Sequence, residues 1–87
     1  MPRVVFTHPV SDVGHWVSKH SERVEAFASW GSNVVDGVSA DGSSNVSVSI
    51  DVHDIEAMQV AMETPEINAA KQAHGVLEPI SVFIESS

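Results

Sequence analysis

Residues 45–53, N-V-S-V-S-I-D-V-H, decide the fold, because aliphatic and polar side chains alternate through them without interruption. A period of two is typical of a β-strand, in which successive side chains point to opposite faces. The β-branched side chains suit a pleated surface. The stretch therefore predicts a central strand with one dry face and one small, polar face. The dry face carries Val46, Val48, Ile50 and Val52, and the other carries Ser47, Ser49, Asp51 and His53.

Three further segments are predicted as strands. Residues 3–8 alternate in the same way and end before a proline, which lacks the N–H that a sheet ladder needs. Residues 34–40 form a weaker strand, since a glycine interrupts them, and this suits a sheet edge or a β-bulge. Residues 41–45, D-G-S-S-N, are turn formers and join that strand to the central one as a hairpin. Residues 80–85 alternate again after a proline and form the last strand.

A helix is predicted between the first two strands. Ser11 or Asp12 can cap its start, and Trp30 and Gly31 close it, with Gly31 as the C′ residue. Its apolar stripe has the period of a helix and consists of Val13, Trp16, Val17, His20, Val24 and Phe27.

A second helical segment follows the central strand. Asp54 can cap it, and the run Thr64-Pro65-Glu66 predicts a kink or a restart, with Thr64 as a new N-cap and Pro65 as the first helical residue. The segment stops at His74 and Gly75. Its apolar side chains are Ile55, Met58, Ala61 and Met62, then Ile67, Ala70 and Ala73.

The predicted order is β-α-β-β-α-β. Right-handed crossovers turn this order into a ferredoxin-like α+β fold, with a four-stranded antiparallel sheet and two helices on one face. The strands at 3–8 and 45–53 then lie in the middle of the sheet. The 87 residues are expected to form a single domain, 1–87. A chain this short buries only about 60% of its unfolded surface, so pairing with a second copy is expected.

The composition excludes several functions. Four Lys and Arg residues against twelve Asp and Glu residues give a formal charge of −8, which repels nucleic-acid backbones and anionic lipids. The absence of cysteine excludes disulfides, iron–sulfur clusters and a cysteine nucleophile. No apolar run approaches the roughly 20 residues of a membrane span. We therefore expect a cytoplasmic protein that binds neither nucleic acid nor membranes.

Several motifs spread over nearly the whole chain carry a family resemblance. They are V-x-D-V-x-x-W at 10–16, D-I-E-A-M at 54–58, T-P-E-I at 64–67, A-H-G-V at 73–76 and E-P at 78–79. On these motifs the chain resembles the dimeric α+β-barrel superfamily, which includes antibiotic-biosynthesis monooxygenases, small polyketide cyclases, stress-responsive barrel proteins and uncharacterised domains of this size. The family ending A-G-V carries an inserted histidine here.

The resemblance implies a homodimer in which two sheets pair face to face, and a ligand cavity between the sheet and the helices of each subunit. The face expected at the dimer interface carries Val5, Thr7, Ser47, Ser49 and Phe83.

Two histidines are the candidate catalytic residues. His20 lies on the apolar stripe of the first helix, and His8 shares the helix-facing side of its strand with Phe6. Both are expected to face one interior, where either could act as a general base or proton shuttle. Alternatively, His20 is a core residue with a satisfied ring, and the apolar neighbours are ordinary packing. The candidate ligand-binding residues are Trp16, Phe27, Met58, Met62 and Arg23, and Arg23 forms either a surface ion pair or an anchor for a ligand carboxylate.

Metal and cofactor chemistry are not predicted. Topology places His8, His15 and His74 towards one end of the two layers and His53 at the other, near Trp30. No pair has a metal-site spacing such as i, i+4 on a helix, so titrating surface histidines are favoured over a metal site. No dinucleotide-binding or phosphate-binding glycine motif is present.

Oxygen-activating and haem-degrading members of the superfamily use an asparagine, a tryptophan and a histidine inside the cavity. Here Asn33 and Asn45 are expected in connections, and no tryptophan is expected on a strand.

Two functions are compatible with the sequence. One is a cyclase-like or monooxygenase-like enzyme that transforms a small aromatic or polyketide-like molecule, with His20 or His8 as proton shuttle. The alternative is a non-catalytic dimeric module that binds a ligand or a protein. A pocket open to solvent and lined by His20 and Trp16 favours the first, and a closed, well-packed interior favours the second.

Overall fold

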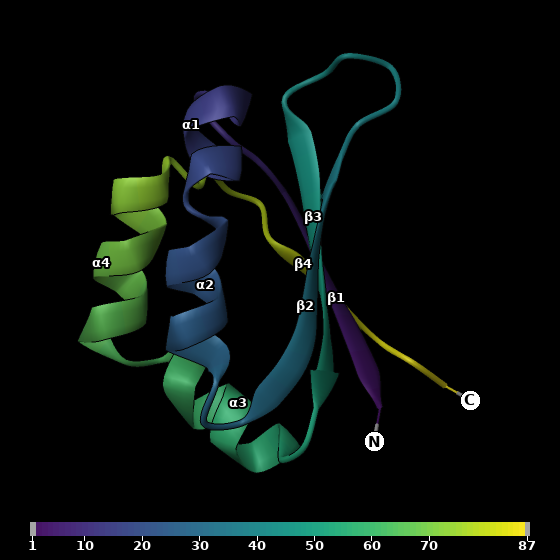
Figure 1. Cartoon of the computed structure of the whole chain (residues 1–87), viewed down its shortest axis with the longest axis vertical. Helices are drawn as coiled ribbons and strands as arrows, with labels where there is room; N and C mark the ends of the chain where they lie inside the picture. Colours follow the sequence, from purple (N-terminus) through teal and green to yellow (C-terminus); the bar gives the residue numbers. More distant parts are fainter. Residues whose placement is uncertain (1, 87) are drawn as a thin grey trace.

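Four antiparallel strands form one sheet in the computed structural model, which describes residues 2–86 and leaves the two ends of the predicted domain, residues 1 and 87, outside the description. The strand order is β2-β3-β1-β4, as expected for a ferredoxin-like α+β fold. Figure 1 views this sheet edge-on, with the helices over one face and no helix of the described chain over the other. The strands are β1 (Arg3–Pro9), β2 (Gly31–Val38), β3 (Asn45–Val52) and β4 (Ser81–Ile84).

The prediction of a central, two-faced strand is confirmed. β3 pairs with β2 on one side and with β1 on the other. Its four aliphatic side chains are all buried, while the serines and the aspartate between them are only half-buried. β1 repeats the pattern, because Val4, Phe6 and His8 are buried and the residues between them are not. The buried sides of both strands form the floor of the core, on which Trp16, Trp30 and Met58 pack.

The second predicted helical segment is confirmed in detail. It divides into α3 (Ile55–Met62) and α4 (Pro65–His74) at the expected proline. The Asp54 carboxylate accepts a hydrogen bond from the N–H of Ala57 at 3.1 Å, and the Thr64 hydroxyl accepts one from Ile67 at 3.3 Å. Gly75 ends α4 in the left-handed conformation, with φ 75°. No helix within residues 2–86 is both long enough and apolar enough to cross a bilayer.

The first predicted helix differs from the expectation. Asp12 caps it, but the helix breaks at Lys19 into α1 (Val13–Ser18) and α2 (His20–Phe27). The Ser18 hydroxyl donates to the His15 carbonyl at 2.6 Å, and such back-bonding competes with the helical hydrogen bonds. The inward stripe is also narrower than predicted: Arg23, seven residues after Trp16, is 4% exposed, while Val17 and Val24 face solvent.

The strand β2 also starts earlier than predicted, at Gly31 instead of residue 34. The expectation that Gly31 ends the first helix is therefore wrong, since α2 stops at Phe27. The edge position is confirmed, and a register shift between Ser32 and Val35 supplies a bulge in which Asn33 has φ 54°. The hairpin turn at 41–45 is confirmed, and β4 lies at the other edge. The start of β2 depends on Gly31, since a methyl group built there lies 2.7 Å from the Cγ2 atom of Ile50.

We predict that Gly31→Ala destabilises the protein by about 1–3 kcal/mol, because the added methyl group overpacks a buried contact. Ile50 is fully buried and cannot move aside. Gly14→Ala is the matched control, since its methyl group meets only the Asp12 carboxylate at 3.5 Å and alanine favours a helix. The free energy of unfolding, from urea titration, checks both variants. An equal effect of the two substitutions would contradict the packing argument.

Candidate functional site

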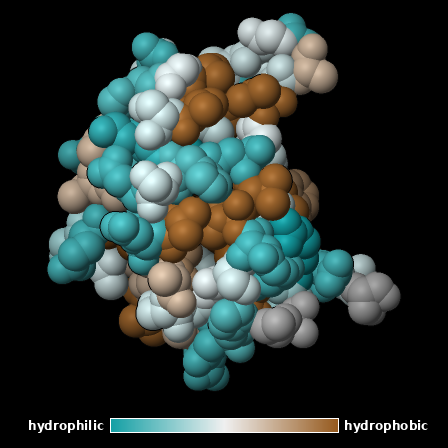
Figure 2. Space-filling model, in the orientation of Figure 1, coloured by the Kyte–Doolittle hydropathy of each residue, from teal (hydrophilic) through white to brown (hydrophobic). Residues whose placement is uncertain are grey.

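A cavity of about 250 Å³ lies between the helices and the sheet. This volume exceeds the ~150 Å³ of an engineered apolar cavity that binds benzene, so a small aromatic molecule fits it. Figure 2 shows apolar atoms gathered in a band between the helix layer and the sheet. The lining is mostly apolar and includes Phe6, Trp16, Phe27, Val48, Met62, Ile67, Val76, Ile80 and Val82, with His8, Arg23, Lys71 and His74 as its polar members.

His8, the second-last residue of β1, contributes an imidazole to this cavity. It is 8% exposed, and its ring meets that of Trp16 edge-on at a centroid distance of 6.0 Å. Its Nδ1 lies 3.2 Å from the Pro9 carbonyl oxygen. A carbonyl only accepts, so Nδ1 carries the proton and Nε2 keeps a lone pair. Burial lowers the pKa of His8 more than the Pro9 hydrogen bond raises it, and the charges of Arg23 and Lys71 lower it further.

Arg23 is the buried cation of the site. Its guanidinium lies 4.0 Å from the centre of the Trp16 ring, within the range of a cation–π interaction. Its Nη2 donates to Oδ2 of Asp36 on β2 at 2.5 Å. The Arg23 Nε and the Asp36 Oδ1 are buried and have no hydrogen-bond partner among residues 2–86. Such unsatisfied buried groups cost about 1–3 kcal/mol each, so this pair is held at an expense in stability.

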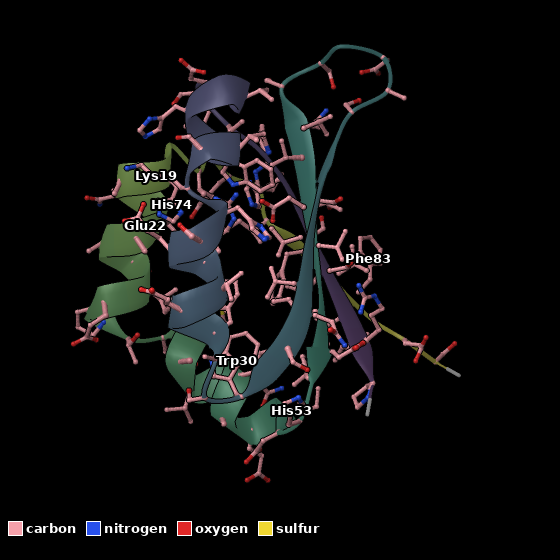
Figure 3. All side chains as sticks on the ribbon, in the orientation of Figure 1. Lys19, Glu22, Trp30, His53, His74 and Phe83 are labelled. Carbon is pink, nitrogen blue, oxygen red and sulfur yellow. The ribbon has the colours of Figure 1, made fainter. Side chains whose placement is uncertain are left out.

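His74 joins the site from the last turn of α4. The Nη1 group of Arg23 lies 3.5 Å from its Nδ1 and donates to it, which requires Nδ1 to be unprotonated. Burial and then the Arg23 charge lower the pKa of His74, against a smaller opposing effect of Glu22. Figure 3 shows His74, Glu22 and Lys19 together where α2 faces α4. Lys19 and Glu22 form an ion pair of 3.3 Å at this outer rim.

The structure brings five of the seven predicted site residues to the cavity: His8, Trp16, Phe27, Met62 and Arg23. Met58 is buried in the core instead and does not line the cavity.

His20 does not face the cavity, contrary to the expectation. Its side chain is 46% exposed, and its Nδ1 pairs with Oδ2 of Asp36 at 2.9 Å on the outer side of the Arg23 pair. Arg23, seven residues after Trp16 and on the same helix face, takes the inward position instead of His20.

Sequence reasoning missed Lys71 and His74 as site residues. Their spacing from Ile67 and Ala70 contained the signal, since positions i, i+3, i+4 and i+7 share one helix face. All four line the cavity.

The remaining histidines lie where topology placed them. His15 bonds through Nε2 to the Ala73 carbonyl at 2.7 Å, at the His8 and His74 end. At the opposite end, the backbone N–H of His53 donates to the Trp30 carbonyl at 2.8 Å, and Figure 3 shows these two side chains close together. A search of the described residues finds no group of three or more His, Asp or Glu side chains placed to hold a metal ion.

Asn33 and Asn45 lie on strands and not in connections as expected, because β2 begins early and β3 begins at Asn45. Neither lines the cavity. Asn33 donates to Asp51 at 2.8 Å in the bulge of β2. The cavity therefore has a tryptophan and a histidine in contact, Trp16 and His8, but the described lining contains no asparagine.

No protein-family model matches the chain, and a search of curated proteins finds no match. Solved structures do resemble it. An antibiotic biosynthesis monooxygenase superposes with a TM-score of 0.69 at 10% identity, covering 100% of this chain and 98% of the other. SnoaB, a cofactor-independent oxygenase from Streptomyces nogalater, gives a TM-score of 0.73 at 13% identity, with 99% and 93% covered. At these identities the likeness concerns the fold, and it confirms the ferredoxin-like α+β arrangement that the superfamily resemblance predicted.

The lowered pKa of His8 predicts how stability depends on pH. The unfolded chain binds a proton at this residue near the usual pKa of 6.5, and the folded chain does so only at lower pH. This contribution to stability is therefore complete above the unfolded pKa and is lost as the pH falls through the folded pKa. We expect the free energy of unfolding to decrease from about pH 8 to about pH 5.5, and to decrease less in His8→Gln. Equal slopes for both proteins, measured by urea titration, would rule out the burial of a neutral His8.

Proposed function

We propose that the protein binds and transforms a small aromatic or polyketide-like molecule in the cavity between the helices and the sheet. One observation carries the proposal: an apolar cavity of about 250 Å³ contains a buried imidazole whose Nε2 has no hydrogen-bond partner among residues 2–86. Apolar pockets with a few convergent polar groups are typical of small-molecule sites. A cavity that contains Trp16 and His8, although not the expected His20, favours this function over a non-catalytic module with a packed interior.

The chemistry that this site supports is removal of a proton from the bound molecule. His8 is suited to accept it at Nε2, since burial keeps the ring neutral at pH 7 and Nδ1 is held by Pro9. A proton taken from a phenol, or from a carbon next to a carbonyl, leaves an electron-rich carbon. That step is common to cyclisation and to oxygenation without a cofactor, and the resemblance to monooxygenase structures, SnoaB among them, supports this reaction class. The proposal requires no metal or cofactor.

We also propose a homodimer that forms through the uncovered face of the sheet. Val5 pairs with Phe83 on one side and Ser49 on the other, and Ser49 pairs with Val35. These four side chains therefore form one row across the four strands. Phe83 is 59% exposed and Val35 53% exposed, and Figure 3 shows Phe83 pointing away from the helices. A second copy would bury this row and enlarge a small core.

A cytoplasmic location, expected from the composition, also stays a prediction.

The proton-transfer proposal is tested with 2-tetralone, an aromatic ketone with acidic C–H groups. We expect the protein to accelerate exchange of its α-protons for deuterium, followed by NMR. His8→Gln should reduce the protein's acceleration of the exchange roughly 100-fold or more, because it removes the general base. His20→Gln is the matched control and should exchange like the wild type, since His20 lies outside the cavity. Equal losses in the two variants would refute the assignment of His8, and no acceleration by the wild type would refute this chemistry.

The homodimer is tested by sedimentation equilibrium at micromolar concentration. We expect a species of twice the 9.3 kDa chain mass, and a monomer for Phe83→Asp, which places a charge in the apolar row. Val60→Asp is the control, because Val60 is equally apolar and exposed but lies on α3, away from the uncovered face. A wild-type protein that sediments as a monomer would overturn the proposal.

A further inference from the structure

The charges around the cavity are opposite to those of the chain as a whole. The chain has four Lys and Arg residues and twelve Asp and Glu residues. Two of the four basic residues, Arg23 and Lys71, line the cavity, and none of the acidic residues among those described does so. A cavity with this lining attracts a negative group, whereas the surrounding surface repels one.

Lys71 contributes most of this unbalanced charge. Asp36 compensates Arg23 from outside the cavity lining, through the ion pair at 2.5 Å. By contrast, no carboxylate within residues 2–86 lies within ion-pair distance of the Lys71 ammonium group. Lys71 is half-buried on α4, on the same face as His74. Its three N–H groups therefore remain available to a ligand.

The same positive charge lowers the pKa of both histidines of the cavity. The charge of Arg23 lowers the pKa of both His8 and His74, after the larger effect of burial, and Lys71 adds to the effect on His8. Both rings are thus held neutral beside the Arg23 guanidinium. An acidic group in the cavity would face donors, while the carboxylates that pair with Arg23 and His74, those of Asp36 and Glu22, belong to residues that do not line the cavity.

We propose that the cavity selects aromatic molecules that carry an anionic oxygen, and that Lys71 and Arg23 hold this oxygen while the ring lies among Trp16 and its apolar neighbours. The anionic group is a carboxylate, a phenolate or an enolate, which share this chemistry. The inference rests on the proposed function and names the class of its ligand. Lys71 and Arg23 are specificity-determining residues in this scheme, and His8 remains the proton acceptor.

The decisive comparison uses two probes of the same shape, 2-naphthoate and 2-naphthamide, by isothermal titration calorimetry at neutral pH and low salt. We expect the wild type to bind the carboxylate roughly tenfold or more tightly than the amide, because only the carboxylate interacts with the positive charges. Raising the salt concentration should reduce this preference.

Lys71→Gln should reduce the preference for the carboxylate by roughly three- to tenfold and leave binding of the amide unchanged. Lys19→Gln is the matched control. It removes the same charge from the facing helix, at a residue that pairs with Glu22 and does not line the cavity. We expect it to retain the preference of the wild type.

Arg23 is tested together with its partner, because removing one member of a buried ion pair leaves an uncompensated charge. In the double variant Arg23→Gln, Asp36→Asn both charges are removed. We expect it to bind the amide and to have lost part of the carboxylate preference, with Asp36→Asn alone retaining or increasing the preference. Thermal melts and NMR spectra identify which of the two variants is folded, and Lys71→Gln decides the inference if neither is.

The outcomes separate this inference from the function on which it rests. Equal affinity of the wild type for both probes would overturn the selection of anions and leave an aromatic site. Binding of neither probe would overturn both proposals. A carboxylate preference that Lys19→Gln reduces as much as Lys71→Gln would also overturn the inference, since it would place the effect in the general field of the helix pair.

Discussion

The buried ion pair between Arg23 and Asp36 is the polar contact that ties the helix layer to the sheet. It joins α2 to the edge strand β2, on the side that faces the core. A buried guanidinium loses its hydration, and a close carboxylate, the face of Trp16 and the ring of His74 replace it here. Removing one partner of such a pair typically costs about 3–5 kcal/mol, whereas matched apolar replacements of both are often neutral. The pair therefore constrains geometry more than it adds to stability.

This constraint also preserves the cavity. An interior lined only with apolar side chains can close by small shifts of its helices, because close packing is favourable. Arg23 resists this, since its head must stay between Asp36, Trp16 and His74. The same head lowers the pKa of both lining histidines, whereas most of the unbalanced charge of the cavity comes from Lys71. Arg23 therefore supports the structure and also influences the chemistry of the site.

The features of the fold that depend on a few adjacent residues were predicted correctly. The alternation in β3, the caps at Asp12, Asp54 and Thr64, and the proline break were all visible, because each depends on a few adjacent residues. The position of His20 was not, since the predicted stripe left out Arg23, a charged residue that takes the inward position beside Trp16. Lys71 and His74 were not assigned to the cavity, because polar side chains on a helix are expected to be exposed until the opposing sheet is known. The aromatic side chains of the candidate site were thus predicted, whereas two of its polar side chains, Lys71 and His74, were not.

The alternation of the strands also separates the proposed ligand cavity from the proposed dimer face. Along β1, Phe6 lines the cavity while Val5, its neighbour, belongs to the uncovered face. Along β4, Val82 lines the cavity and Phe83 points away from it. Each side chain of a strand points to only one face of the sheet. Substitutions on the uncovered face can therefore alter assembly without changing a cavity-lining group, and any effect of dimerisation on ligand binding must pass through movement of the strands themselves.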